Sequence, residues 1–440
     1  MKCKFKIGRR FTFLTAGLCL IFLISLVFSS TSSFSANNKT YETLKLFTEV
    51  LDLIEKNYVE EIDTDEIIHE AIHGMITALD PHSAYWSPEV YHEMEVDTKG
   101  VFGGLGVVIT MKDDFITVIS PIEDKPAYEA GIEAGDRIVK INGDSTKGMT
   151  LMDAVQILRG PAGTKVTITI AREAFDTPKD FEITRAIIKI QSVKYKKYND
   201  DIAYIRITQF QETTVDELRK VLKEITQDGP TPRGLVLDLR NNPGGLLDQS
   251  ILVSDVFLKD GTIVSTKGRS PESEKVYRAH DDGDEPEFPM IVLINGGSAS
   301  ASEIVSGALQ DSGRAILLGT QTFGKASMQI VVPLDDGSAL KLTTARYYTP
   351  NGRSIQATGI QPDIRVEYRT PDNNAEKKTP MLREKDLSGH LEGIGESAAD
   401  EKEGESSAEN KHTELLKDNQ LKHAVDLLKS WDLFKKMQQC

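Results

Sequence analysis

Residues 290–313 read MIVLINGGSASASEIVSGALQDSG, and this stretch decides the fold. It opens with a short apolar run, as in a strand that is buried on both faces of a sheet. A turn rich in glycine and serine follows, and apolar residues then recur at helical spacing as far as Gly313. Similar apolar runs, GLVLDL at 234–239 and AILLG at 315–319, alternate with helical patterns. The sequence therefore predicts a mixed α/β core, which we place at residues 176–370.

The turn in this stretch contains three serines, Ser298, Ser300 and Ser302. A serine between a strand and a helix is exposed, and N–H groups at the helix end can stabilise an oxyanion, as an acyl-transfer nucleophile requires. Serines at such positions more often cap the helix. The residues alone do not choose between these roles, or among the three serines.

A nucleophilic serine needs a base, and the predicted core holds one histidine, His280, in an acidic loop. A Ser-His pair is therefore poorly supported. The predicted strand FGKASMQIVVPL at 323–334 offers Lys325, and a period of two places Lys325, Ser327 and Gln329 on one face. A lysine can act as a base if burial lowers its pKa from about 10.4 towards 7. An ordinary exposed lysine is the alternative.

The runs NGGSASASEIVSGALQDSG at 295–313 and LLGTQTFGKASMQ at 317–329 closely resemble the carboxyl-terminal processing (tail-specific) serine peptidases. In that family the nucleophile precedes the lysine by 25 positions, which is the separation of Ser300 and Lys325. The resemblance implies that Ser300 is the nucleophile, Lys325 the general base, and Gln329 the residue that orients the lysine. It also implies a ClpP/crotonase-like peptidase core, an endopeptidase activity, and no metal or organic cofactor.

Two further motifs agree with this resemblance. LVLDLRNNPGG at 235–245 resembles the family loop in which a glycine N–H, here that of Gly244 or Gly245, forms the oxyanion hole together with the N–H of Ala301. LDPHSAYW at 79–86 resembles the stretch that precedes the PDZ domain of the family.

Short alternating strands and glycine-rich turns follow Gly100 and predict a small, mostly β domain at 96–175. Its motifs AGIEAGDRIVKING and LRGPAGTKV resemble a PDZ domain. The resemblance implies that backbone N–H groups of the loop GGLGV bind the terminal carboxylate of a substrate tail. Arg159 lies where a contact that gates the active site could form. The loop residues are Gly103, Gly104, Leu105, Gly106 and Val107.

The chain begins with clustered lysines and arginines, followed by an 18-residue apolar run at 11–28 and a small polar stretch. This order predicts an export signal over residues 1–36, either cleaved near Ala36 or retained as an inner-membrane anchor. The cationic flank stays in the cytoplasm, so the remainder is expected in the periplasm or at the cell surface. Cys3 and Cys19 lie in the signal, which leaves Cys440 without an intramolecular disulfide partner.

Three outer segments complete the predicted organisation. Helical spacing predicts an N-terminal helical region at 37–95. Residues 371–411 lose periodicity and fill with polar and acidic residues, which predicts a disordered linker. An amphipathic pattern at 412–440 predicts a helix that docks on its own chain or on a partner. The fold class is therefore multi-domain α+β.

The formal net charge of −15 argues against nucleic acid as a partner. The family resemblance implies protein substrates with unstructured C-termini, and some members of the family work with helical-repeat lipoprotein adaptors. Helical segments at both ends of the chain favour a homo-oligomer.

Three rival functions remain open. The sequence HEAIH at 69–73 matches the zinc peptidase pattern H-E-x-x-H, with Glu93 as a conceivable third ligand, although an exposed helix face explains it as well. A membrane-anchored PDZ adaptor without enzymatic activity would bind tails but cleave nothing. Crotonase-like chemistry on acyl-thioesters is the third, and export would separate the chain from coenzyme A.

Overall fold

The structure is a computed structural model that describes residues 32–198, 201–227, 231–369, 382–392 and 418–438. Residues 1–31 of the predicted signal, which include its apolar run at 11–28, Cys440 and most of the predicted linker lie outside these residues. The chain divides into two compact units, Met1–Gly74 and Met75–Cys440.

The first unit contains helix α2 (Ser32–Asn57) and most of helix α3 (Thr64–Thr77), so the helices predicted near the N-terminus are present. Asp65 and Glu66 lie in the first turn of α3, where a carboxylate interacts favourably with the helix dipole. No helix in the described ranges combines the length and the apolarity that a membrane span requires.

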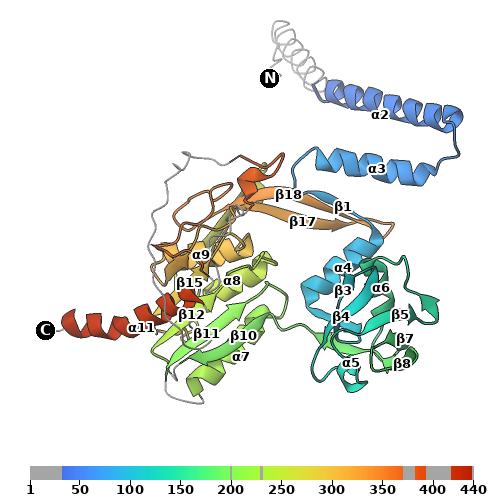
Figure 1. The fold of residues 1–440 in the computed structure, drawn as a ribbon. Helices are drawn as coiled ribbons and strands as arrows, with labels where there is room; N and C mark the ends of the chain where they lie inside the picture. Colours follow the sequence, from blue (N-terminus) through green and yellow to red (C-terminus); the bar gives the residue numbers. More distant parts are fainter. Residues whose placement is uncertain (1–31, 199–200, 228–230, 370–381, 393–417, 439–440) are drawn as a thin grey trace, which may run out of the picture. The chain divides into compact units, whose positions relative to one another are not determined.

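A β-rich domain opens the second unit (Figure 1). Its main sheet is antiparallel, with the strand order β3-β4-β5-β7-β8 and with β6 paired to β5. Val166, Ile168 and Ile170 of β7 are buried on one face, as the period of two requires, and Thr169 between them is buried as well. The strands are β3 (Val107–Lys112), β4 (Phe115–Pro121), β5 (Arg137–Ile141), β6 (Asp144–Ser145), β7 (Lys165–Ala171) and β8 (Lys179–Thr184).

Two helices, α5 (Pro126–Glu129) and α6 (Leu151–Leu158), pack against this sheet. A separate antiparallel ribbon joins β2 (Val101–Gly104) to β9 (Ala186–Lys189). The domain therefore continues past residue 175, where the sequence analysis ended it, because β8 and β9 both pair with its earlier strands.

The core is a six-stranded sheet in the order β10-β11-β12-β15-β16-β19, parallel except for β10. Strands β12 and β15 are buried along their whole length, as the apolar runs predict. The strands are β10 (Val193–Tyr198), β11 (Ile202–Ile207), β12 (Gly234–Asp238), β15 (Met290–Ile294), β16 (Ile316–Gly319) and β19 (Ile364–Arg365).

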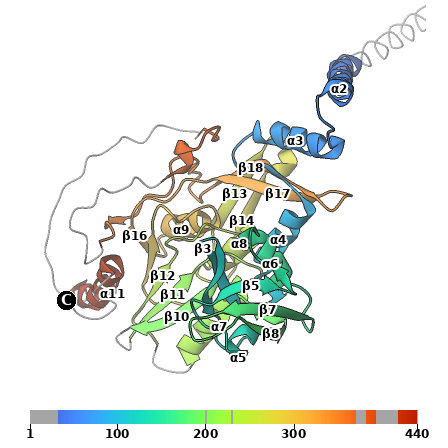
Figure 2. The same cartoon turned by 45° about the vertical axis from the view of Figure 1, so that its right-hand side comes forward.

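Helices cover both faces of this sheet (Figures 1 and 2). One face packs on α7 (Thr214–Gln227), α8 (Leu247–Asp255) and α9 (Ala301–Asp311). The other face packs on the C-terminal helix α11 (Asn419–Gln438), which buries Leu421, Ala424, Val425 and Leu428 against it. The predicted C-terminal helix therefore docks on its own chain.

A second sheet has the order β1-β18-β13-β14, and β17 pairs with β18. Strand β1 (Ala84–Trp86) lies within the predicted N-terminal helical region, yet it pairs with β18 (Ala339–Tyr348). That prediction is therefore incomplete, because residues 80–86 join the core. The remaining strands are β13 (Thr262–Gly268), β14 (Lys275–Arg278) and β17 (Ser327–Pro333), and helix α4 (Pro88–Lys99) follows β1.

The prediction of a disordered linker over 371–411 is wrong for its described part, residues 382–392. A short 3-10 helix, η2 (Glu384–Asp386), forms there, and the Glu384 side chain is completely buried. Acidic composition favours solvation, but here the carboxylate finds hydrogen-bond donors inside the core.

Candidate active site

Ser300 lies at the turn between β15 and α9. Its backbone has φ 55° and ψ −113°, a conformation that non-glycine residues rarely adopt. Such strain persists only where the surrounding structure enforces it, and it is concentrated at functional sites. The residue is half-buried, directly before the first N–H groups of α9. The predicted strand, tight turn and helix are therefore present around this serine.

The two neighbouring serines donate to backbone carbonyls of the motif LVLDLRNNPGG at 235–245. Ser298 Oγ donates to the carbonyl of Leu239 at 2.8 Å, and Ser302 Oγ donates to the carbonyl of Asn242 at 2.9 Å. Both side chains are fully buried. These hydroxyls hold two loops together, whereas the Ser300 side chain is placed beside the phenol of Tyr347.

Gly244 approaches Ser300 so closely that no side chain fits between them. A Cβ at Gly244 would lie 2.9 Å from Ser300 Cβ and 3.1 Å from the N atom of Ala301, and its φ is +108°. The N–H of Gly244 donates to Asn242 Oδ1 at 2.9 Å, so it is already occupied. Across the described ranges, the N–H groups of Gly245 and Ala301 have no acceptor. Of the three predicted oxyanion donors, these two are available.

Lys325 lies in the loop before β17, and the prediction that it belongs to the strand is wrong. The strand begins at Ser327 because the preceding N–H groups bond outside the sheet. The N–H of Lys325 donates to Glu303 Oε2 at 2.9 Å, and the N–H of Ala326 donates to Gln356 Oε1 at 2.8 Å. The hydroxyl of Tyr347 donates to the Lys325 carbonyl.

The Lys325 amine is placed where its charged form is disfavoured. Burial lowers the pKa of Lys325 to about 8, and the nearby cation of Lys341 acts in the same direction. The carboxylates of Glu384, Glu303 and Asp80 oppose this shift. A lysine with this pKa is neutral in a substantial fraction of molecules near pH 8, which a general base requires.

Glu303 joins the serine turn to the lysine loop, and the sequence analysis missed it. Its Oε2 accepts the N–H groups of both Ser300 and Lys325, each at 2.9 Å, so these two residues are neighbours in space. Its Oε1 accepts from Thr322 Oγ1 at 2.5 Å and from the N–H of Gly324 at 2.8 Å. The pattern S-x-x-E from Ser300 to Glu303 is a capping-box signature and could have indicated this bond.

Burial raises the pKa of Glu303 to about 7, and the four hydrogen bonds that it accepts act in the opposite direction. Burial also raises the pKa of Tyr347 well above its ordinary value, and the charge of Glu303 adds to this. Tyr347 therefore remains a neutral donor beside Ser300.

Within the part of the chain that the structure describes, Gln329 makes no hydrogen bond to Lys325. Its Nε2 donates to Ser327 Oγ at 2.9 Å and to Thr343 Oγ1 at 3.1 Å. The pairing register shifts between Met328 and Gln329, where β18 carries one extra residue, Thr344. Ser327 and Gln329 do share a face, whereas Lys325 precedes the strand.

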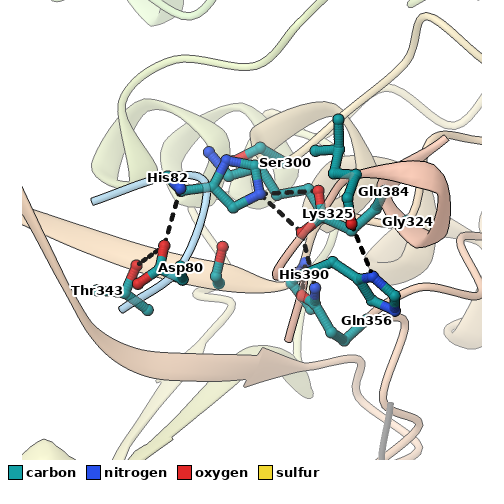
Figure 3. Close-up of polar contacts among 12 residues, drawn as sticks. Asp80, His82, Ser300, Gly324, Lys325, Thr343, Gln356, Glu384 and His390 are labelled. Atoms are coloured by element: carbon teal, nitrogen blue, oxygen red, sulfur yellow. Dashed lines mark hydrogen bonds and ion pairs between the residues drawn. The ribbon is translucent and has the colours of Figure 1, made fainter. Parts of the chain in front are cut away.

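A histidine enters the site from outside the predicted core. His280, the one histidine of that core, has a largely exposed side chain beside Asp255. His82 lies instead among the polar side chains near Lys325 (Figure 3), because β1, which follows it, pairs with β18 in the second sheet. Its Nε2 contacts both carboxylate oxygens of Glu384, at 2.7 and 2.8 Å.

The GGLG loop connects β2 to β3. The carbonyl of Leu105 accepts from Ala127, and that of Gly106 accepts from Ile122, both at 2.8 Å. Throughout the described residues, the N–H groups of Leu105 and Gly106 have no acceptor. Gly103 admits no side chain, since its Cβ would lie 2.0 Å from the carbonyl oxygen of Gly160. The loop leads into β3, which begins at Val107, and helix α6 packs against β3.

Arg159, the residue at the C-terminal end of α6, binds α4 and β2. Its guanidinium pairs with Glu93 and lies 4.5 Å from the centre of the Phe102 ring. Glu93, the conceivable third zinc ligand, is therefore engaged by an arginine. His69 and His73 lie on α3. In the described ranges, no three His, Cys, Asp or Glu side chains are arranged to hold a metal ion.

Three family models match the chain. Residues 201–366 match peptidase family S41, residues 117–172 match a PDZ domain, and residues 27–90 match the N-terminal domain of the activating protease CtpB. A solved structure, the photosystem II D1 C-terminal processing protease, is 29% identical; the match covers 73% of this chain and 92% of that one, with a TM-score of 0.43.

Two curated relatives are similar over most of their length. The carboxy-terminal-processing protease of Bartonella bacilliformis is 47% identical over 393 residues, 88% of this chain and 89% of the relative. The carboxy-terminal processing protease CtpA of Bacillus subtilis is 36% identical over 337 residues, 76% of this chain and 69% of the relative. The chain therefore belongs to the carboxy-terminal-processing proteases of peptidase family S41, which are serine peptidases, and it carries a PDZ domain.

Proposed function

We propose that the chain is an exported endopeptidase in which Ser300 is the nucleophile and Lys325 the general base. One observation carries this proposal: Glu303 binds the backbone of both residues through one carboxylate oxygen, and the lysine beside the strained serine has a pKa of about 8. A scaffold without activity would gain nothing from a buried lysine in that position. Gln329 would turn towards Lys325 when substrate binds.

The reaction proceeds in two halves. Ser300 Oγ bonds to the carbonyl carbon of the scissile peptide while neutral Lys325 takes its proton. The N–H groups of Gly245 and Ala301 donate to the oxyanion, and Gly244 provides the close approach. Protonated Lys325 then gives the proton to the departing amine, which leaves an acyl-enzyme. Water loses a proton to Lys325 as its oxygen bonds to the ester carbon. The bond from that carbon to Ser300 Oγ then breaks and protonated Lys325 returns the proton to Oγ, which releases the new C-terminal carboxylate and restores Ser300 and neutral Lys325.

The substrate tail is proposed to bind at the GGLG loop. Its terminal carboxylate would accept from the open N–H groups of Leu105 and Gly106, and its last residues would extend along β3 beside α6. Arg159 would leave Glu93 when the PDZ domain responds to a bound tail. We place the enzyme outside the cytoplasm as a homo-oligomer, and a helical-repeat lipoprotein adaptor is a conceivable partner.

The test is cleavage of an unfolded protein with an apolar C-terminus by the full chain, alongside Ser300→Ala and Lys325→Ala. Each substitution removes a reacting group, so kcat/KM is expected to fall by about 10³-fold or more. Tail binding, measured by fluorescence anisotropy, should be unchanged. Lys385→Ala, at an exposed lysine, should cleave like the wild type. Cleavage that survives in Ser300→Ala or Lys325→Ala would refute the assignment.

A further inference from the structure

The segment 382–392 brings a buried carboxylate to the lysine loop. Glu384 has no exposed surface, although its neighbour Lys385 is exposed. Its oxygens accept from His82 Nε2 at 2.7 and 2.8 Å, and Oε1 also accepts from Gln356 Nε2 at 2.9 Å (Figure 3). A buried carboxylate is stable only with such partners.

Three contacts of this segment lead to the loop that carries Lys325. Gln356 accepts the N–H of Ala326 through Oε1 and donates to Glu384 through Nε2, so its side chain links Glu384 to the lysine loop. The N–H of Glu384 donates to the carbonyl of Phe323 at 3.3 Å, and the Arg383 guanidinium binds the Gln321 side chain. The loop is therefore held near its start and near its end.

The partner His82 is itself fixed by a tight turn. The carboxylate of Asp80 accepts from the N–H of His82 at 2.8 Å, and from the N–H and hydroxyl of Ser83 at 2.9 and 2.7 Å. Thr343 Oγ1 donates to the same carboxylate at 3.1 Å. Burial raises the pKa of Asp80, but these hydrogen bonds lower it by more, so the pKa lies below its ordinary value. The imidazole therefore meets Glu384 from a rigid support.

The groups facing Lys325 come from four elements. Lys341 and Tyr347 lie on β18, Glu303 on α9, Asp80 in the turn before β1, and Glu384 on η2 with His82 against it. Among the groups that counteract burial of the lysine cation, the charge of Glu384 acts most strongly.

We propose that Glu384 is a positioning residue of the active site: held by His82 and Gln356, it fixes the loop of Lys325 and supplies a negative charge beside the lysine amine. This inference rests on the proposed function for its catalytic meaning. The inference also assigns a role to His82, the histidine of the LDPHS motif. His82 holds Glu384 in place, and Lys325 carries out the proton transfer.

The charge and the reach of Glu384 can be tested separately in the full chain. Glu384→Gln removes the charge and nearly keeps the size, whereas Glu384→Asp keeps the charge and is too short to reach both partners. Glu392→Gln, at an exposed glutamate of the same segment, is the matched control. Competitive acetylation across pH, read by mass spectrometry, measures the titration midpoint of the Lys325 amine without any need for peptidase activity.

In Glu384→Gln the midpoint is expected to fall by about one pH unit, because the protonated lysine loses a nearby negative charge. The acid side of the kcat/KM profile should move the same way. Glu384→Asp should keep a midpoint close to the wild type and lower kcat about tenfold, since a loosened loop misplaces the amine. Glu392→Gln should change neither quantity.

Equal midpoints in Glu384→Gln and Glu392→Gln would overturn the role of the charge, and an unchanged kcat in Glu384→Asp would overturn the role of the reach. A loss of activity in Glu384→Gln without any movement of the midpoint would show a purely structural residue. If Glu384→Gln fails to fold by circular dichroism, Glu384→Asp still decides. A wild type that titrates as expected but cleaves nothing would count against the proposed function alone.

Discussion

The turn at 298–303 and the segment at 382–392 each bring one fully buried glutamate to the loop of Lys325, but by different means. Glu303 comes from the first turn of α9 and accepts three backbone N–H groups and one hydroxyl. Glu384 comes from a short 3-10 helix and, among the residues that the structure describes, accepts only from the side chains of His82 and Gln356.

Because of this difference, Glu303 acts mainly on the alignment of Ser300 and Lys325, and Glu384 acts mainly through its charge near the lysine. Backbone donors are present whatever the neighbouring side chains are, so Glu303 fixes the relative position of Ser300 and Lys325 directly. Glu384 depends on the side chains of His82 and Gln356, and of these two Gln356 links it to the lysine loop through the N–H of Ala326. We therefore expect changes at Glu303 to affect the alignment of the reacting groups, and changes at Glu384 to affect the proton affinity of Lys325.

Of the changes at the two glutamates, Glu303→Gln is expected to have the largest effect. The amide nitrogen of glutamine cannot accept, so at least one donor among Ser300, Thr322, Gly324 and Lys325 is left unpaired in a buried place. Misplacement of the reacting groups should lower kcat/KM by about 100-fold or more. The assay is peptide cleavage, with Glu392→Gln as the exposed control. Activity within a few-fold of the wild type would show that Glu303 does not align the site.

How far the sequence predicts this site depends on the range of the interactions. The strand, turn and helix around Ser300 follow from local periodicity, and the bond from Glu303 to the Ser300 N–H spans three residues. The family resemblance places Lys325 near that turn. These features could be found because each depends on neighbours in the chain, or on a motif of fixed spacing.

The features that the sequence analysis missed depend on distant partners. The bond between His82 and Glu384 spans 302 residues, and no periodicity marks either residue. Acidic composition alone predicts a solvated segment, and only the fold shows the donors that bury Glu384. The alternating sequence around Lys325 predicts a strand, whereas Glu303, Gln356 and Tyr347 hold its backbone in a loop.

A smaller effect concerns stability, because the lowered pKa that lets Lys325 act as a base also destabilises the folded state. The pKa of Lys325 is lowered from 10.5 to about 8, so the folded state disfavours its cation. This cost is fully present below pH 8 and disappears as the pH rises towards 10.5. Lys325→Met should therefore raise the free energy of unfolding at pH 7 by about 3 kcal/mol, while activity is lost.

Urea unfolding at pH 7 and at pH 10 measures this change, and the gain should shrink at the higher pH. Lys385→Met, at an exposed lysine, should alter stability by less than about 0.5 kcal/mol at either pH. A Lys325→Met variant that is less stable than the wild type at pH 7 would mean that Glu303 and Glu384 stabilise the cation more than burial destabilises it.

The last prediction concerns how kcat/KM of the wild type depends on pH. Neutral Lys325 is the active form, so kcat/KM should fall about tenfold per pH unit as the pH drops below about 8. Below about pH 7, Glu303 also takes up a proton, and a protonated oxygen no longer accepts all of the surrounding N–H groups. The profile should then steepen to about 100-fold per pH unit.

The second step belongs to the geometry that Glu303 imposes, so it distinguishes the two glutamates. In Glu303→Gln the residual activity should follow a single step, because no carboxylate remains at that position to be protonated. In Glu384→Gln both steps should remain, with the lysine step moved to lower pH. A profile that is flat from pH 5 to 9 would contradict a lysine base, and a single step in the wild type would show that the protonation of Glu303 leaves the alignment intact.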